Sequence, residues 1–186
     1  MGVLAMLRRN PHERAGYLLY GAAVAAARAP YFYLPTGAGG LGVPDTLDGR
    51  FDLVGLHVFL VIRRLGAAAP KLAQSVFDAM FSDMDVNLRE MGVGDLSVGK
   101  KVKIMWEAFH GRSTAYQAAL QADDVHALAA ALARNVWRGA PPAGAAVALA
   151  QIARAQDAHL AGQPVSELEA GRVSFSPVAA TPLGIL

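Results

Sequence analysis

The sequence predicts an all-α fold, an irregular bundle of about six to seven helices in a single domain. Three observations favour it. Alanine, the strongest helix former, is abundant; apolar residues recur at three- and four-residue steps; and glycine or proline clusters separate these stretches. With 186 residues, 54% of them hydrophobic and 17% charged, the chain is long enough for one core and too apolar for disorder.

The first predicted helix runs from Pro11 to about Arg28. Asn10 is a suitable N-cap, Pro11 occupies the first helical position, and Glu13 completes a capping box. Basic residues precede an uncharged run that ends in alanines, so a cleaved signal peptide is the alternative for this segment. The capping signals favour a first helix of the mature domain.

A long loop follows Pro30, which ends the first helix. Tyr31, Phe32 and Tyr33 lie in this loop beside a glycine cluster at positions 37–42. Aromatic residues in a loop have no helical stripe to bury them, and exposed aromatic residues are frequent anchors at interfaces. We therefore expect these three side chains to be exposed contact residues.

The second helix is predicted to begin at an aspartate cap and to end before the glycine at position 66. Asp45, Asp48 and Asp52 are the three candidates for the cap. His57 falls on the apolar stripe of this helix, where a histidine is more often a core residue than a ligand. We expect it to be buried.

The third and fourth helices are amphipathic and are separated by a glycine turn at 92–94, after which Asp95 or Ser97 starts the fourth. The apolar stripe of the third helix consists of Leu72, Val76, Phe77, Met80, Phe81, Met84 and Leu88. That of the fourth consists of Val98, Val102, Met105, Trp106, Phe109, Tyr116 and Leu120. We expect both stripes to face the core.

Two more helices complete the predicted bundle. Asp123 or Asp124 caps one that runs to about Arg138, and the last ends near Ala161. The predicted organisation is an N-terminal segment (1–10), a helical domain (11–165) and an extended or flexible C-terminal tail (166–186).

No motif in the sequence indicates catalysis. The absence of cysteine removes thiolate nucleophiles, disulfides and Cys-based zinc sites. The glycine pattern at 37–42 lacks the strand and helix of a dinucleotide fold, and 94–101 has lysine where a P-loop needs a hydroxyl. The segment 83–94 lacks the glycine and final acid of a calcium loop, and the five histidines are never three or four residues apart. We expect no enzyme, no cofactor and no metal.

Charge and hydropathy exclude two further classes. A net charge of +2 is far from the basic stripe of a protein that reads nucleic acid. The uncharged runs at 15–27 and 53–62 are shorter than the roughly 18 to 20 residues that a membrane-spanning helix needs.

Several stretches together resemble the ubiquinol-cytochrome c chaperone family. They are residues 41–51, 56–57, 64–65, 81–85 and 88–96, with 109–112 and 115–116 at the expected distance downstream. The run of aspartates, glycines and Arg89-Glu90 is not a generic helical pattern. The resemblance covers roughly residues 12–140, and the region beyond carries no motif that we match.

The resemblance implies an all-helical assembly factor for the cytochrome bc1 complex that binds newly made cytochrome b. A small partner chaperone, the ribosome and a peripheral membrane contact are the further partners it implies. In a bacterium the expected place is the cytoplasmic face of the inner membrane, and in a eukaryote the matrix side of the inner mitochondrial membrane.

The candidate client-binding residues combine the loop aromatics with the polar residues of the resembling stretches. They are Tyr31, Phe32, Tyr33, Asp45, Asp48, Arg50, Asp83, Asp85, Arg89, Glu90, Arg112 and Tyr116. Asp45, Asp48 and Arg50 are expected to pin the loop to the helices. The group around 83–90 either pairs internally or presents a client-binding face, and Arg112 and Tyr116, one turn apart, share a face.

Other interpretations of the sequence stay open. The four methionines at 80, 84, 91 and 105 suit an adaptable groove, although three of them fit the core stripes. A generic helical adaptor for another protein or a membrane surface is the main alternative function. A haem-handling protein or enzyme that uses a histidine across helices is the third.

Overall fold

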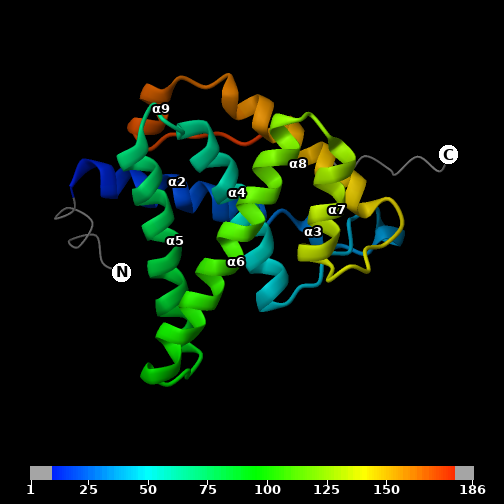
Figure 1. The fold of residues 1–186 in the computed structure, drawn as a ribbon, viewed down its shortest axis with the longest axis horizontal. Coiled ribbons are helices and arrows are strands. Elements are labelled where there is room, and N and C mark those ends of the chain that lie inside the picture. Colours follow the sequence, from blue (N-terminus) through cyan, green and yellow to red (C-terminus); the bar gives the residue numbers. More distant parts are fainter. Residues whose placement is uncertain (1–9, 179–186) are drawn as a thin grey trace.

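The computed structural model describes residues 10–178, and all regular elements in that range are helices, as predicted (Figure 1). In chain order they are α2 (Pro11–Ala27), α3 (Pro30–Tyr33), the 3-10 helix η1 (Thr36–Ala38), α4 (Leu47–Leu65), α5 (Pro70–Glu90), α6 (Asp95–Gln121), α7 (Val125–Val136), α8 (Ala145–Ala161) and α9 (Val165–Glu169).

Helix α4 is the centre of the fold. Thirteen of its 19 residues are buried, and α2, α5, α6, α7 and α8 all pack against it. The predicted core position of His57 is confirmed: its side chain is buried, and its Nδ1 lies 2.8 Å from the carbonyl oxygen of Leu53. Burial lowers the pKa of His57 to about 4, so the imidazole is neutral at pH 7.

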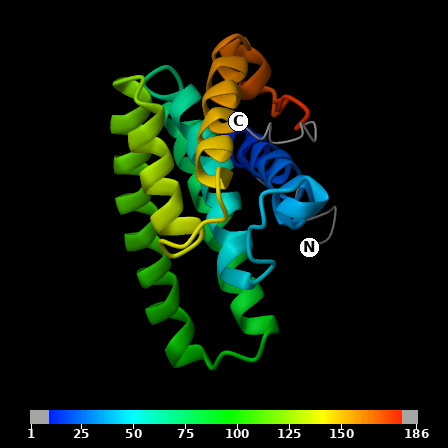
Figure 2. The same ribbon diagram turned by 90° about the vertical axis from the view of Figure 1, so that its right-hand side faces the viewer.

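Helices α5 and α6 form an antiparallel hairpin whose far end projects beyond the other helices (Figures 1 and 2). We call residues 84–105, which make up this end, the arm. Its inner sides pack together through residues such as Leu88 and Val98, which are buried. The two amphipathic stripes therefore exist in large part as predicted: on the arm, Leu88 and Val98 are buried apart from the main core, whereas Val102 and Met105 pack against that core.

Two of the expected caps are confirmed and one is wrong. The Asn10 side chain accepts a hydrogen bond from the Glu13 amide at 2.9 Å, and Asp124 accepts from two amides at the start of α7. At α4 the cap is Thr46, whose hydroxyl accepts from the Gly49 amide, and not one of the three aspartates. A hydroxyl and a carboxylate both serve at this position, so composition alone could not choose between them.

The expectation that the loop aromatics are exposed is wrong for Tyr31 and Phe32, whose residues are 8% and 0% exposed. They form α3, and the following chain folds back, so that the Leu41 and Val43 amides donate to the carbonyls of Tyr31 and Phe32. This turn directs both rings into the core. Tyr33 is half-buried and donates its hydroxyl to the carbonyl of residue 27 at 2.9 Å.

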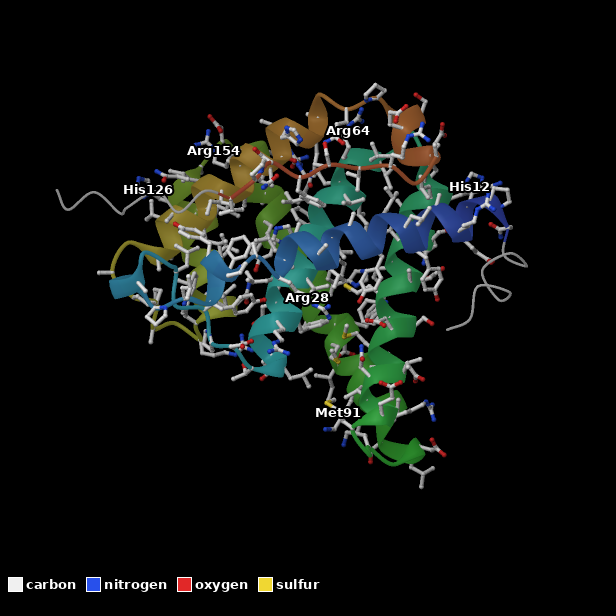
Figure 3. The ribbon with its side chains drawn as sticks, turned by 180° about the vertical axis from the view of Figure 1, so that it is seen from behind. His12, Arg28, Arg64, Met91, His126 and Arg154 are labelled. Atoms are coloured by element: carbon white, nitrogen blue, oxygen red, sulfur yellow. The ribbon has the colours of Figure 1, made fainter. Side chains whose placement is uncertain are left out.

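Residues 172–178 are extended and run alongside α8 (Figure 3). The side-chain amide of Gln156 donates to the Ser176 carbonyl and accepts from its amide, at 2.7 and 2.8 Å. Gln163 makes the same pair of bonds with Ser174, at 2.8 and 2.9 Å. The two glutamine side chains thus make the hydrogen bonds that a neighbouring strand would otherwise make to this extended backbone.

The close approach of α2 and α5 gives a test of the packing. A Cβ on Gly16 would lie 2.7 Å from the Ser75 backbone, whereas a Cβ on Gly21, in the same helix, meets nothing within 4 Å. We expect Gly16→Ala to lower the free energy of unfolding by ~1–3 kcal/mol through overpacking. Gly21→Ala, the matched control, should raise it by up to ~1 kcal/mol through helix propensity. Urea denaturation of both variants measures these changes in the free energy of unfolding. A change in the same direction for both variants would contradict the close contact.

Candidate binding site

An open groove of about 1090 Å³ lies between α4, α5, α6 and α8. This volume is slightly above the range of small-ligand pockets, which is about 300–1,000 Å³. Its lining includes five aromatic side chains from three helices: Phe59, Phe77, Trp106, Phe109 and His110.

Four of these rings, those of Phe77, Trp106, Phe109 and His110, contact one another and form an aromatic wall. Trp106 and His110, one turn apart on α6, have ring centroids 4.0 Å apart, and Phe77 of α5 lies 5.6 Å from His110 and 5.7 Å from Phe109. Trp106 was expected in the buried stripe of the fourth helix, and this expectation is wrong, because the residue is 44% exposed. It lies at the rim of the groove, where α6 turns part of its stripe towards the opening.

The charged groups of the groove are already paired. Arg63 donates to Asp157 at 2.9 Å, and Arg64 donates to two carbonyl oxygens at and after the end of α8, including that of Leu160. Ser113 contributes a buried hydroxyl with no hydrogen-bond partner among the described residues. The groove therefore presents apolar surface and hydrogen-bonded polar groups, with one positive charge, that of Arg64, in excess over the acids of its lining, which suits a largely apolar partner.

A second polar cluster is centred on a buried carboxylate beside the groove helices. The carboxylate of Asp52, whose side chain is fully buried, lies between Arg112 of α6 and Arg138, which follows α7. Arg138 donates to Asp52 at 2.8 Å and lies 3.7 Å from Asp48, and Arg112 also lies over the ring of Phe51. The cluster joins three helical segments that are far apart in the sequence.

The buried carboxylate gives the fold a specific pH dependence. Burial raises the pKa of Asp52 to about 6, although both arginines pull it down. The folded state then binds the Asp52 proton more tightly than the unfolded state, so protonated Asp52 stabilises the fold, and this contribution is lost as pH rises from about 4 to about 6. Asp52→Asn cannot ionise and so lacks this loss. We expect its free energy of unfolding, relative to that of wild type, to rise by ~2–3 kcal/mol as the pH rises from 4 to 7. Urea unfolding at several pH values measures this difference, and a constant difference would contradict it.

The structure does not bring the candidate residues from the sequence into one site. Arg112 and Tyr116 do share a face, but it points inward: Tyr116 is buried, packs on Phe59 and accepts a hydrogen bond from Asn135. Asp83 is also an internal link, because it accepts a hydrogen bond from the hydroxyl of Tyr20, on α2, at 2.6 Å.

The remaining charged candidates lie at the surface. Arg50 makes a bidentate pair with Asp45 at 2.6 and 3.1 Å, which lowers the pKa of that carboxyl. Arg89 pairs with Asp85 at 2.6 Å on the arm, where Glu90 is exposed. These pairs hold neighbouring turns in place, so the pinning role is consistent with the geometry.

The described residues contain neither a metal-binding cluster nor a helix that could span a membrane. Between residues 10 and 178, no group of three or more His, Cys, Asp or Glu side chains is arranged to hold a metal ion. No helix in that same range is long and apolar enough to cross a membrane.

Comparisons with known proteins agree with one another. A family model described as ubiquinol-cytochrome C chaperone matches residues 40–175. The ubiquinol-cytochrome-c reductase complex assembly factor 1 of Xenopus laevis is 29% identical over 97 residues, 50% of this chain and 48% of that protein. The same-named protein of Mus musculus is 30% identical over 98 residues, 51% of this chain and 33% of that protein. This chain thus corresponds to about half of the frog relative and a third of the mouse relative.

The crystal structure of the Cbp3 homolog from Brucella abortus is similar over nearly the whole fold. It has a TM-score of 0.78 and 36% sequence identity, with 95% of this chain and 97% of that chain covered. The family match extends to residue 175, beyond the point near 140 where the sequence motifs end. It thus includes α8, which lines the groove, and the extended segment that α8 holds.

Proposed function

Because the chain belongs to the ubiquinol-cytochrome c chaperone family, we propose that it assists assembly of the cytochrome bc1 complex by binding and stabilising newly made cytochrome b. The family is one of chaperones rather than enzymes. The relatives are named for assembly of the ubiquinol-cytochrome c reductase complex, which supports the coarser part of the proposal. The choice of cytochrome b as the client is the finer part, and the resemblance is what suggests it.

The groove is the observation that carries the proposal. An unassembled membrane protein exposes apolar helices, and water penalises that surface by about 25 cal/mol per Å². The aromatic wall around Trp106 and Phe77 offers apolar area, and Arg63 and Asp157 beside it neutralise each other. We infer that an apolar helical segment of the client lies in this groove while its final partners are absent.

Location and further partners follow from the same proposal. A client in the inner membrane requires the chaperone to work at its surface, on the cytoplasmic side in bacteria or the matrix side in mitochondria. A small partner chaperone and the ribosome would bind elsewhere on the fold, and the exposed pairs around Asp45 and Asp85 are surfaces open to them.

Site-specific photocrosslinking tests the client and the groove together. A photoreactive residue replaces Gln117, which lines the groove, and in a matched variant Gln151, which is exposed on α8 outside it. The expected result is a crosslink to cytochrome b from position 117 and none from position 151. A different dominant partner from position 117 would favour a generic adaptor and contradict the proposal.

A deletion strain tests the pathway. We expect loss of the chain to lower the amount of assembled bc1 complex and to leave the other respiratory complexes unchanged. Normal bc1 levels in the deletion strain would contradict an assembly role.

A further inference from the structure

The arm exposes apolar side chains that the groove does not account for. Four of them are at least 40% exposed: Val86 at 40%, Met91 at 53%, Leu96 at 100% and Ile104 at 55%. Met91 lies near the free end of the arm, away from the packed body (Figure 3). Single exposed apolar residues are ordinary, but four within one projecting hairpin mark an interaction surface.

The outer face of α6 combines these apolar residues with lysines. Leu96, Lys100, Lys103 and Ile104 are spaced by three and four residues, so they share one side of the helix. The opposite side carries Val98, which is buried against α5. The outer face is thus a strip in which leucine and isoleucine flank two lysines, and Lys101 is exposed beside it.

The lysines supply most of the free positive charge at the arm. Arg89 is held by Asp85 and Asp95 and Glu90 is exposed beside it, so the positive charge of the arm is confined to the lysines of α6. Lys103 has a loose partner in Glu107, at 3.9 Å and with both side chains more than half exposed, whereas no ion pair within 4.0 Å is found for Lys100 or Lys101 in the described structure. A partner that complements this face must be anionic and must also accept apolar side chains.

We propose that the outer face of α6 docks the arm onto the surface of an anionic lipid bilayer. Lysines attract acidic headgroups, while the leucine and isoleucine enter the boundary between headgroups and acyl chains. Long lysine side chains allow both contacts at once, because the ammonium groups reach outward from a partly buried helix. An RNA partner would use phosphate contacts with stacking aromatic residues, and this strip has exposed aliphatic side chains in their place. The docking surface is separate from the groove and does not require that the client be cytochrome b.

Vesicle flotation of the whole chain tests this proposal. We expect the protein to float with vesicles of phosphatidylglycerol and phosphatidylcholine, to stay behind with phosphatidylcholine alone, and to dissociate as salt is added. Two arm variants, Leu96→Ser with Ile104→Ser and Lys100→Gln with Lys101→Gln and Lys103→Gln, should each lose at least about tenfold in partitioning.

Matched controls separate the arm from general charge and hydrophobicity. Arg14→Gln with Lys71→Gln and Arg134→Gln removes the same charge from other exposed positions, and Leu47→Ser removes an apolar residue that is 49% exposed on α4. Both should bind vesicles within about twofold of wild type, and circular dichroism should show all variants folded, because every substituted position is exposed.

Three outcomes would overturn the proposal. They are no flotation of wild type with anionic vesicles, equal losses in the arm and control variants, and tight binding of a single-stranded RNA that the Leu96→Ser and Ile104→Ser variant retains. The crosslink from position 117 is measured separately, so failure of membrane docking and failure of the proposed client can be told apart.

Discussion

Arg112→Ala is expected to lower the free energy of unfolding at pH 7 by ~2 kcal/mol, because the Asp52 carboxyl loses a compensating cation and Phe51 loses the guanidinium that lies over its ring. Asp52 is fully buried, and Arg112 is one of the two cations that compensate it. Without Arg112 the buried carboxyl keeps only Arg138, its pKa rises further, and it takes up a proton near neutral pH, which costs about 1.4 kcal/mol at pH 7. Urea denaturation monitored by circular dichroism measures the loss.

Two further variants identify the cause of that loss. Arg50→Ala removes an arginine of a pair in which both side chains are more than half exposed, and it should lower the free energy of unfolding much less than Arg112→Ala does. Adding Asp52→Asn to Arg112→Ala should recover part of the stability, because the remaining side chain is then neutral. The cost of Arg112→Ala should also shrink at pH 5, below the pKa of about 6 that burial gives Asp52. Equal losses for Arg50→Ala and Arg112→Ala would contradict the buried cluster.

The sequence is sufficient for most of the helices because their signals are local. Capping by Asn10 and Asp124, the two amphipathic stripes and the glycine breaks each depend on residues within a few positions of one another. The short helix α3 was missed because its reason is not local: the chain after it folds back and buries Tyr31 and Phe32. The absence of a helical stripe was wrongly read as exposure.

The groove could not be predicted in the same way. Its lining combines Ile62 of α4, Phe77 of α5, Trp106 of α6 and Asp157 of α8. No spacing along the chain indicates that these four residues lie together. The one available signal was a tryptophan and a histidine one turn apart at 106 and 110, in a stripe wider than a core contact needs. Asp52 was one of three candidates for the cap, because the sequence does not show that α4 is buried on all sides over residues 51–61.

Trp106→Ala is expected to weaken client binding about thirtyfold, a loss of ~2 kcal/mol, which is typical of a tryptophan that contributes strongly to an interface. Trp106 forms the rim of the groove and stacks on His110 at 4.0 Å, so its face is already positioned for an apolar partner. Because the residue is 44% exposed, the fold should lose only about 1 kcal/mol. The dissociation constant for cytochrome b held in nanodiscs, measured with the purified variant, checks the expectation.

Leu47→Ala is the matched control, because Leu47 is 49% exposed but lies at the start of α4, outside the groove. It should bind the client like wild type, and in a deletion strain it should restore the bc1 complex fully, whereas Trp106→Ala should restore it only in part. If both variants restore the complex and bind equally well, the groove is not the client-binding site. If Trp106→Ala instead unfolds the protein, His110→Ala, at another exposed position of the same wall, provides the second test of the groove.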